Sequence, residues 1–132
     1  IKELGNIGKY ENKFKRKVTD RNSKLFQKVL YVDPEKKFQI VIRGRVDGMS
    51  EEDNCIIESK NRSRHLFKTL RPHERVQIEA YMFLSGMNRC ILTEYYNEES
   101  FEIDYSHHEE FWYECCKKIV NAVKHMLKDI PL

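Results

Sequence analysis

A chain of 132 residues with 40% hydrophobic side chains is long enough for one folded domain with its own core, and a second folded domain is not expected. No apolar run approaches the length that spans a bilayer, which excludes a membrane-embedded protein, and the net charge is only +3. We expect a single domain over residues 1–132, and a fragment of a longer chain because it begins at Ile1 rather than Met.

The first predicted element is an amphipathic helix from about Ile7 to Val18. Tyr10 and Phe14 lie between these two residues, so that apolar side chains recur at spacings of three and four. The polar segment TDRNS that follows is expected to end this helix.

Three strands are predicted next, over residues 24–33, 38–49 and 55–62. The first alternates apolar and polar positions and ends in the turn-forming segment DPEKK, while the third, CIIESKNR, begins with an apolar run that favours a central place in a sheet. The segment GMSEEDN before the third strand is rich in turn formers, which favours a hairpin. Together these segments predict an antiparallel meander.

A second helix is predicted from Pro72, which suits a first helical turn, to Gly86, which suits a C-terminal cap. A basic and irregular segment over residues 62–70 separates this helix from the preceding strand. The side chains expected to form its core stripe are Val76, Ala80, Phe83 and Leu84.

Two more strands, over residues 89–96 and 100–106, are predicted as a hairpin, and a long helix from His108 closes the chain. The order of helix, three strands, helix, two strands and helix predicts an α/β fold of the α+β type, with a mixed central sheet flanked by helices. The apolar stripe expected on the closing helix consists of Trp112, Cys115, Cys116, Ile119, Val123, Met126 and Leu127.

Charge is unevenly distributed along the chain. Residues 1–37 carry 11 Lys and Arg against 5 acidic residues, whereas residues 76–132 carry 5 against 10. We expect an anionic partner to approach the face built from the first half, and the alternative is a solvated surface. The basic side chains available for nucleic acid are Lys13, Lys15, Arg16 and Lys17, followed by the main candidates Arg43, Arg45, Arg62, Arg64 and Arg71.

Charged side chains also end two neighbouring apolar runs. Asp47 ends the first run, and Glu58 and Lys60 end the second. Because side chains alternate along a strand, Glu58 and Lys60 share one face, and a hairpin would place Asp47 beside Glu58. Two carboxylates at adjoining strand ends make a hard oxygen site for a divalent cation such as Mg²⁺, completed by water and substrate phosphate. The arrangement indicates phosphodiester hydrolysis.

Each of these signals also has a simpler explanation. Asp47 with Gly48 could form only a turn, and Glu58 with Lys60 only an exposed ion pair on one face of a strand.

Phe67, in the basic segment after the third strand, could stack on a base.

The order Asp47, then Glu58-x-Lys60, resembles the signature of the PD-(D/E)XK nuclease superfamily. The next helix contains QIEAY, in which Gln77 and Tyr81 form the Q-x-x-x-Y pattern of the RecB-like branch that includes lambda-type exonucleases. The resemblance covers most of the chain and implies a restriction-endonuclease-like core.

One feature of the superfamily's name is absent, since Val46 rather than proline precedes Asp47. RecB-like members commonly have Gly-x-x-Asp instead, as residues 44–47 do here. The leading helix of this family often supplies a further acidic residue, and Glu11 is the candidate in this chain.

The resemblance implies a metal-dependent mechanism. Asp47 and Glu58 would bind one or two Mg²⁺ or Mn²⁺ ions, and the backbone carbonyl of Ser59 would complete the site. Lys60 would orient or help deprotonate the attacking water and offset the growing negative charge.

The helix motif is implied to line the same site. Gln77 and Tyr81 lie one helical turn apart and so share one face. By the resemblance, Gln77 would lie near the attacking water or Lys60, and Tyr81 would touch phosphate.

The four cysteines bear on cofactor and compartment. Some RecB-like nucleases bind an iron–sulfur cluster through one early and three late cysteines, a spacing that this chain lacks, so no cluster is expected. The absence of C-x-x-C pairs predicts reduced thiols and an intracellular, reducing compartment, the cytoplasm or nucleus, with an organelle left open. The cysteines are Cys55, Cys90, Cys115 and Cys116.

We therefore expect a metal-dependent, exonuclease-like deoxyribonuclease of replication, recombination or repair, with RNA left open as substrate. Family members of this kind work as oligomers or with clamps or helicases, fused or separate. By the resemblance, this chain could likewise act as an oligomer or with a clamp or helicase. The alternatives are a structure-specific, nicking or RNA-cleaving endonuclease, a non-catalytic nucleic-acid-binding module, and an interaction module. The last predicts that Asp47 and Glu58 lie far apart.

Overall fold

The computed structural model describes residues 24–131, so the helix expected over residues 7–18, with Glu11, lies outside the described residues. Within them, no helix is long and apolar enough to span a membrane. The elements are β1 (Leu25–Val32), β2 (Gln39–Arg45), β3 (Gly48–Ser50), β4 (Cys55–Asn61), α2 (Pro72–Ser85), β5 (Arg89–Tyr96), β6 (Glu99–Ser106) and α3 (Glu109–Leu127).

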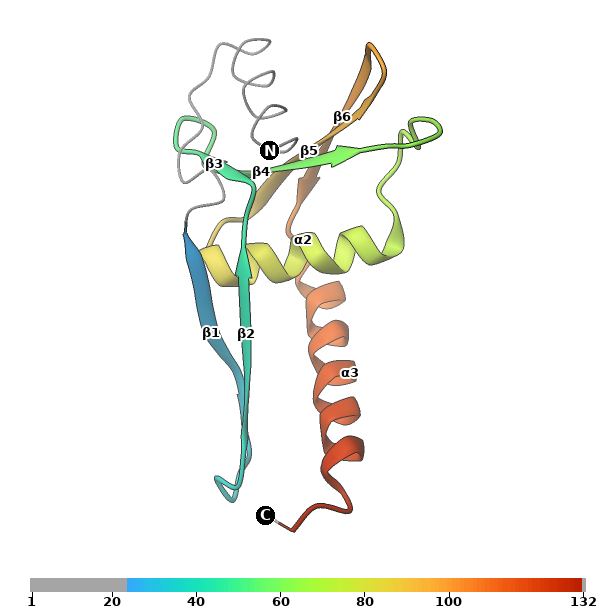
Figure 1. Ribbon diagram of the computed structural model, residues 1–132. Helices are drawn as coiled ribbons and strands as arrows, with labels where there is room; N and C mark the ends of the chain where they lie inside the picture. Colours follow the sequence, from blue (N-terminus) through green and yellow to red (C-terminus); the bar gives the residue numbers. More distant parts are fainter. Residues whose placement is uncertain (1–23, 132) are drawn as a thin grey trace.

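The strands form two sheets. A four-stranded sheet has the order β3-β4-β5-β6, in which β4 and β5 are parallel and the other pairs are antiparallel, and β1 and β2 form a separate antiparallel pair. Helix α2 is the crossover between the two parallel strands, and Figure 1 shows it crossing the middle of the molecule between the four-stranded sheet and α3. The predicted mixed sheet flanked by helices, a restriction-endonuclease-like α+β fold, is confirmed.

The second predicted strand is interrupted at Val46 and Asp47. Its first part is β2, paired with β1, and its second part is β3, paired with β4 through Gly48 and Ser50. The expectation of one continuous strand over residues 38–49 was therefore wrong, although the antiparallel pairings hold. The reason is that both residues at the break are buried, and the Asp47 side chain bonds to the backbone of β4. The break places Asp47 at the junction of the two sheets.

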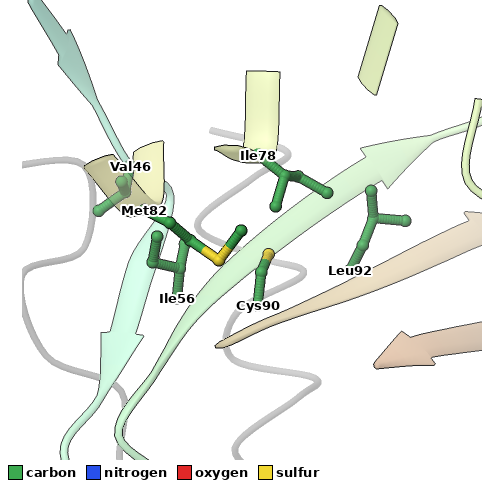
Figure 2. Packing of buried hydrophobic residues seen from close by; sticks show 6 residues of the cluster. All are labelled: Val46, Ile56, Ile78, Met82, Cys90 and Leu92. Atoms are coloured by element: carbon green, nitrogen blue, oxygen red, sulfur yellow. The ribbon is translucent and has the colours of Figure 1, made fainter. Parts of the chain in front are cut away.

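The core lies between α2 and the two central strands. On β4, Ile56 faces α2, and so do the alternate residues that follow it on the same face of the strand, Glu58 and Lys60. The same apolar layer therefore supports the charged side chains at the end of the strand. The buried cluster, shown in Figure 2, consists of Val46, Ile56, Ile78, Met82, Cys90 and Leu92.

The core stripe of α2 differs from the predicted one. Leu84 is buried as expected, but Val76 is 38% exposed, and Ile78 and Met82 face the core instead. Two glutamates also occupy buried positions of this helix because partners from other elements satisfy them. Because polar residues occupy buried positions of α2, the spacing of its apolar residues did not predict which face is buried. These glutamates are Glu74 and Glu79.

One of these glutamates joins α2 to the end of β6. The carboxylate of Glu79 accepts hydrogen bonds from the Tyr105 hydroxyl at 2.6 Å and from the His108 backbone N–H at 2.8 Å. His108 is also the N-cap of α3, where its side chain accepts the N–H of Phe111 at 3.1 Å. The start of α3 is thereby tied to α2.

Only the first part of the predicted stripe on α3 reaches the core. Trp112 is buried and packs on Phe83 of α2, with ring centroids 5.5 Å apart, whereas Met126 is 73% exposed. The later turns of α3 extend away from α2 and the four-stranded sheet, as Figure 1 shows, so within residues 24–131 their side chains have no core to pack against. The expectation that Met126 is buried was wrong.

At Gly86, the C-terminal cap of α2, adding one methyl group should strain the backbone. It ends the helix with φ 78°, and its N–H donates to the carbonyl of Met82 at 2.9 Å. A Cβ would meet no atom within 4 Å, so Gly86→Ala should lower the free energy of unfolding by about 1–2 kcal/mol through backbone strain alone. Urea unfolding measures this loss. Gly86→Asn should lose less, and an unchanged Gly86→Ala variant would contradict the strain.

Candidate active site

Asp47 is attached directly to the strand that carries the other charged residues. Its Oδ2 accepts a hydrogen bond from the backbone N–H of Ser59 at 2.8 Å, and both residues are buried. Ser59 lies between Glu58 and Lys60 on β4, so this bond brings Asp47 next to the E-x-K segment. The interaction-module alternative, with Asp47 and Glu58 far apart, does not agree with this contact.

Lys60 connects β4 to the motif on α2. Its Nζ lies 2.8 Å from Gln77 Oε1 and 4.0 Å from Glu58 Oε2. Because an ammonium only donates hydrogen bonds, Gln77 must present its carbonyl to Lys60, which directs its amide group to Tyr81. That amide donates to the Tyr81 hydroxyl at 3.0 Å. One connected chain of polar side-chain contacts therefore runs through Glu58, Lys60, Gln77 and Tyr81.

The burial of Glu58 distinguishes this arrangement from an ordinary surface pair. Glu58 is 2% exposed, whereas the side chain of Lys60 is 23% exposed. Burying a carboxylate is costly, and a charged or hydrogen-bonding partner offsets that cost. The alternative of an exposed Glu58–Lys60 ion pair was therefore wrong.

Gly44, the glycine of the Gly-x-x-Asp pattern, lets β2 approach α2 closely. A Cβ at this position would lie 3.2 Å from Cε1 of Tyr81 and 3.3 Å from Cδ1 of Leu84. Both contacts are tighter than ordinary van der Waals distances, so any side chain at Gly44 would press on the ring of Tyr81. The glycine thus permits the position of the tyrosine at the site.

The donor set suits a hard divalent cation that keeps part of its water shell. Asp47 and Glu58 offer carboxylate oxygens at neighbouring positions, the ligand type that Mg²⁺ and Mn²⁺ prefer. Across residues 24–131, no group of three or more His, Cys, Asp or Glu side chains could hold a metal ion. Glu11 lies outside the described residues, and the roles of Ser59 and Glu11 as ligands stay predictions.

Arg62, expected to contact nucleic acid, has a different position. Its guanidinium bonds to Glu74 of α2 at 2.7 and 3.1 Å and to Glu94 of β5 at 2.7 Å, and its side chain is only 10% exposed. The expectation of a phosphate contact is therefore corrected. Arg62 balances two buried carboxylates, which bind three of its nitrogen atoms.

Glu94 also holds the loop that follows β4. Its two carboxylate oxygens accept the backbone N–H groups of Phe67 at 3.1 Å and Lys68 at 2.7 Å. Lys68 has φ 58°, a conformation that these bonds help to maintain. Sequence reasoning missed this function, although an acidic residue inside the apolar run RCILTEYY was the available signal.

The other candidate arginines remain accessible. Arg43 and Arg45 are exposed on β2, the strand that leads to Asp47. Arg64 and Arg71 are exposed on the loop between β4 and α2. These side chains stay predicted contacts for nucleic acid.

Glu74 should make the stability of the domain sensitive to acid. Burial raises the pKa of Glu74, but the hydrogen bonds and charge of Arg62 outweigh burial and hold this pKa below its usual range. A carboxylate with a lowered pKa in the folded state stabilises fully above its unfolded value of about 4.3, and this contribution disappears as the pH falls through the folded value. The free energy of unfolding should therefore fall as the pH drops below about 5. In Glu74→Gln that fall should be smaller, and an equal fall would contradict the role of Glu74.

Comparisons with known proteins support the fold. No family model matches the sequence, and no curated protein matches it either. Among solved structures, the crystal structure of SSO0001 aligns with a TM-score of 0.65 at 18% identity, covering 98% of this chain and 58% of that one.

Two further matches are structures of one enzyme. The alkaline exonuclease LHK-Exo from Laribacter hongkongensis aligns with a TM-score of 0.62 at 18% identity over 92% of this chain and 62% of that one. LHK-Exo in complex with dAMP aligns with a TM-score of 0.55 at 12% identity over 95% of this chain and 69% of that one. The chain thus spans about three fifths of SSO0001 and of the first exonuclease structure. At these identities the likeness shows a shared fold.

Proposed function

We propose that this domain is a metal-dependent nuclease of the PD-(D/E)XK type that hydrolyses the phosphodiester bonds of DNA in an exonuclease-like manner. The observation that carries the proposal is the position of Lys60, whose ammonium lies between Gln77 and Glu58 on a strand to which Asp47 is bonded. A fold shared with an alkaline exonuclease supports it, as does the dAMP complex of that enzyme.

The carboxylates would hold the metal. Asp47 and Glu58 are the ligands, with the Ser59 carbonyl and Glu11 as further oxygen donors, and Mg²⁺ or Mn²⁺ fits such a set. When bound, the cation lowers the pKa of water and neutralises charge on the phosphoryl oxygens. The hydrogen bond from Ser59 N–H keeps the Asp47 carboxylate in place as substrate enters.

Lys60 would act on the water and the phosphate. An ammonium has three donors, and Gln77 accepts from one of them, which orients the other two. One can donate to the attacking water and one to a phosphoryl oxygen, where the positive charge offsets the charge that develops in the transition state.

The motif on α2 would position these groups. Gln77 holds Lys60, and its amide group in turn holds the Tyr81 hydroxyl, which Gly44 allows to lie close to β2. The hydroxyl would then donate to a phosphate oxygen of the bound strand. Gln77 is a positioning residue in this scheme, because it acts on Lys60.

The wider setting is part of the same proposal. We place the enzyme in a reducing intracellular compartment, in DNA replication, recombination or repair, either as an oligomer or with a helicase or clamp. An iron–sulfur cluster is not part of the proposed enzyme. Cleavage of RNA, or endonucleolytic cutting, would leave the same residues in the same roles.

End-labelled single- and double-stranded DNA and RNA, incubated with Mg²⁺, Mn²⁺ or EDTA, test this function. We expect cleavage of DNA with either metal and none with EDTA, and release of mononucleotides identifies an exonuclease. A protein that binds DNA tightly and never cuts it with any metal would instead be a binding module.

A further inference from the structure

The loop between β4 and α2 borders a cationic hollow beside the candidate active site. The hollow has a volume of about 450 Å³, within the range of ligand pockets, and begins at Asn61, the residue after Lys60. Figure 1 shows the loop beyond the end of β4, where the chain returns to the start of α2. Arg64, His65 and Arg71 line it, and no lining side chain is acidic.

The hollow is built on a fixed loop. Glu94 accepts two consecutive backbone N–H groups of this loop and the Nε–H of Arg62, and all three bonds are between 2.7 and 3.1 Å. The carboxylates of Glu74 and Glu94 are buried and bonded to Arg62. Arg64 and Arg71 are exposed. A fixed cationic surface binds an anion with little loss of conformational freedom.

Phe67 orders one of the two exposed cations. The guanidinium of Arg71 stacks on its ring at 4.3 Å, and that of Arg62 lies 4.8 Å from the same ring. His65 contacts the ring edge-on with a centroid distance of 4.8 Å. Phe67 is therefore already covered by side chains of this chain and acts as a support for Arg71, which corrects its predicted role in stacking on a base.

We propose that Arg64 and Arg71 form a subsite for the backbone phosphates of a nucleic-acid strand next to the phosphodiester at Lys60. A guanidinium fork matches two phosphate oxygens, and the stacked Arg71 is oriented for this contact. The subsite rests on the proposed nuclease function for its ligand, because the neighbouring Lys60 site is what favours a phosphodiester over another polyanion. Arg62 contributes to the subsite only by holding the loop.

Binding measured without cutting tests the subsite. Fluorescence anisotropy in EDTA, with a labelled single-stranded DNA at several salt concentrations, gives both the affinity and its salt dependence. Arg64→Ala and Arg71→Ala should each weaken binding about 3- to 10-fold, and the double variant should reduce the slope of log K against log salt by about 1.4, because each phosphate contact to a single strand contributes about 0.7.

The controls test whether the loss of binding depends on the positions of Arg64 and Arg71 or only on the removal of positive charge. Lys118→Ala removes one exposed cation of α3 and should change neither affinity nor slope. Arg64→Lys with Arg71→Lys should keep the slope, and urea unfolding checks that every variant folds. Circular and linear strands distinguish backbone phosphates, which both contain, from a terminal phosphate, and equal affinity for the two is expected.

Three results would overturn the subsite. These are a double variant that behaves like Lys118→Ala, a loss of binding confined to linear strands, and equally strong competition by polyglutamate of the same charge. Failure of the proposed function would appear differently, as normal binding with this arginine dependence but no cleavage in Mg²⁺ or Mn²⁺.

Discussion

Replacing Glu58 with Gln should reduce DNA cleavage at least about 100-fold while leaving DNA binding in EDTA close to that of the unmodified domain. The substitution keeps the shape of a side chain that is 2% exposed, and it removes the negative charge that would hold the metal and that lies 4.0 Å from Lys60. Losing transition-state charge stabilisation at such a site typically costs two to three orders of magnitude in rate. Single-turnover cleavage of end-labelled DNA in Mg²⁺ is the measurement.

Two companion variants make this result specific. Lys60→Ala should lower the rate by about 100-fold or more, since it removes the group proposed to orient the water and offset charge. Glu51→Gln changes an exposed glutamate in the turn between β3 and β4 and should leave the rate unchanged. Full cleavage by Glu58→Gln or by Lys60→Ala would refute the proposed mechanism.

Replacing Arg62 with Ala should lower the free energy of unfolding by about 3–5 kcal/mol. The side chains of Glu74 and Glu94 are 3% and 0% exposed, and both bond to this one guanidinium at 2.7 Å. Without Arg62 these buried carboxylates lose their shared cation while desolvation still opposes their charge. Because a domain of this size is stable by only about 5–15 kcal/mol, urea unfolding should show a large shift of the midpoint.

Arg89 provides the matched control for this prediction. It bonds to Asp104 at 2.8 and 2.6 Å, a geometry as good as that of Arg62, but the two side chains are 38% and 50% exposed. Solvent screens such a pair, so Arg89→Ala should cost no more than about 1 kcal/mol. Equal losses in the two variants would show that burial of Glu74 and Glu94 is not the source of the effect.

Local patterns were sufficient for most of the helices and strands. Helix α2 begins at Pro72 and is capped by Gly86, and the hairpin of β5 and β6 lies where alternating residues flank a short turn. The same rules placed Glu58 and Lys60 on one face of a strand, which the contact of Lys60 with Gln77 agrees with. These features depend on residues within a few positions of one another, so a single sequence contains them.

The buried charges could not be predicted in this way. Arg62 looked like a surface cation because its partners are 12 and 32 residues away, on α2 and β5. Whether a glutamate such as Glu94 is buried depends on a cation and backbone donors that only the fold brings to it. For the same reason, the exposed and buried faces of α2 could not be told apart from its sequence.

The sequence by itself determined the order of the elements and which charged side chains share a strand, because both follow from spacing along the backbone. Tertiary structure alone decided that the second strand is interrupted at Asp47, that this carboxylate bonds to Ser59 N–H, and that Gln77 bonds to Lys60. It also decided which arginines remain available to a ligand. These outcomes depend on long-range partners, whose attraction must exceed the cost of removing charges from water.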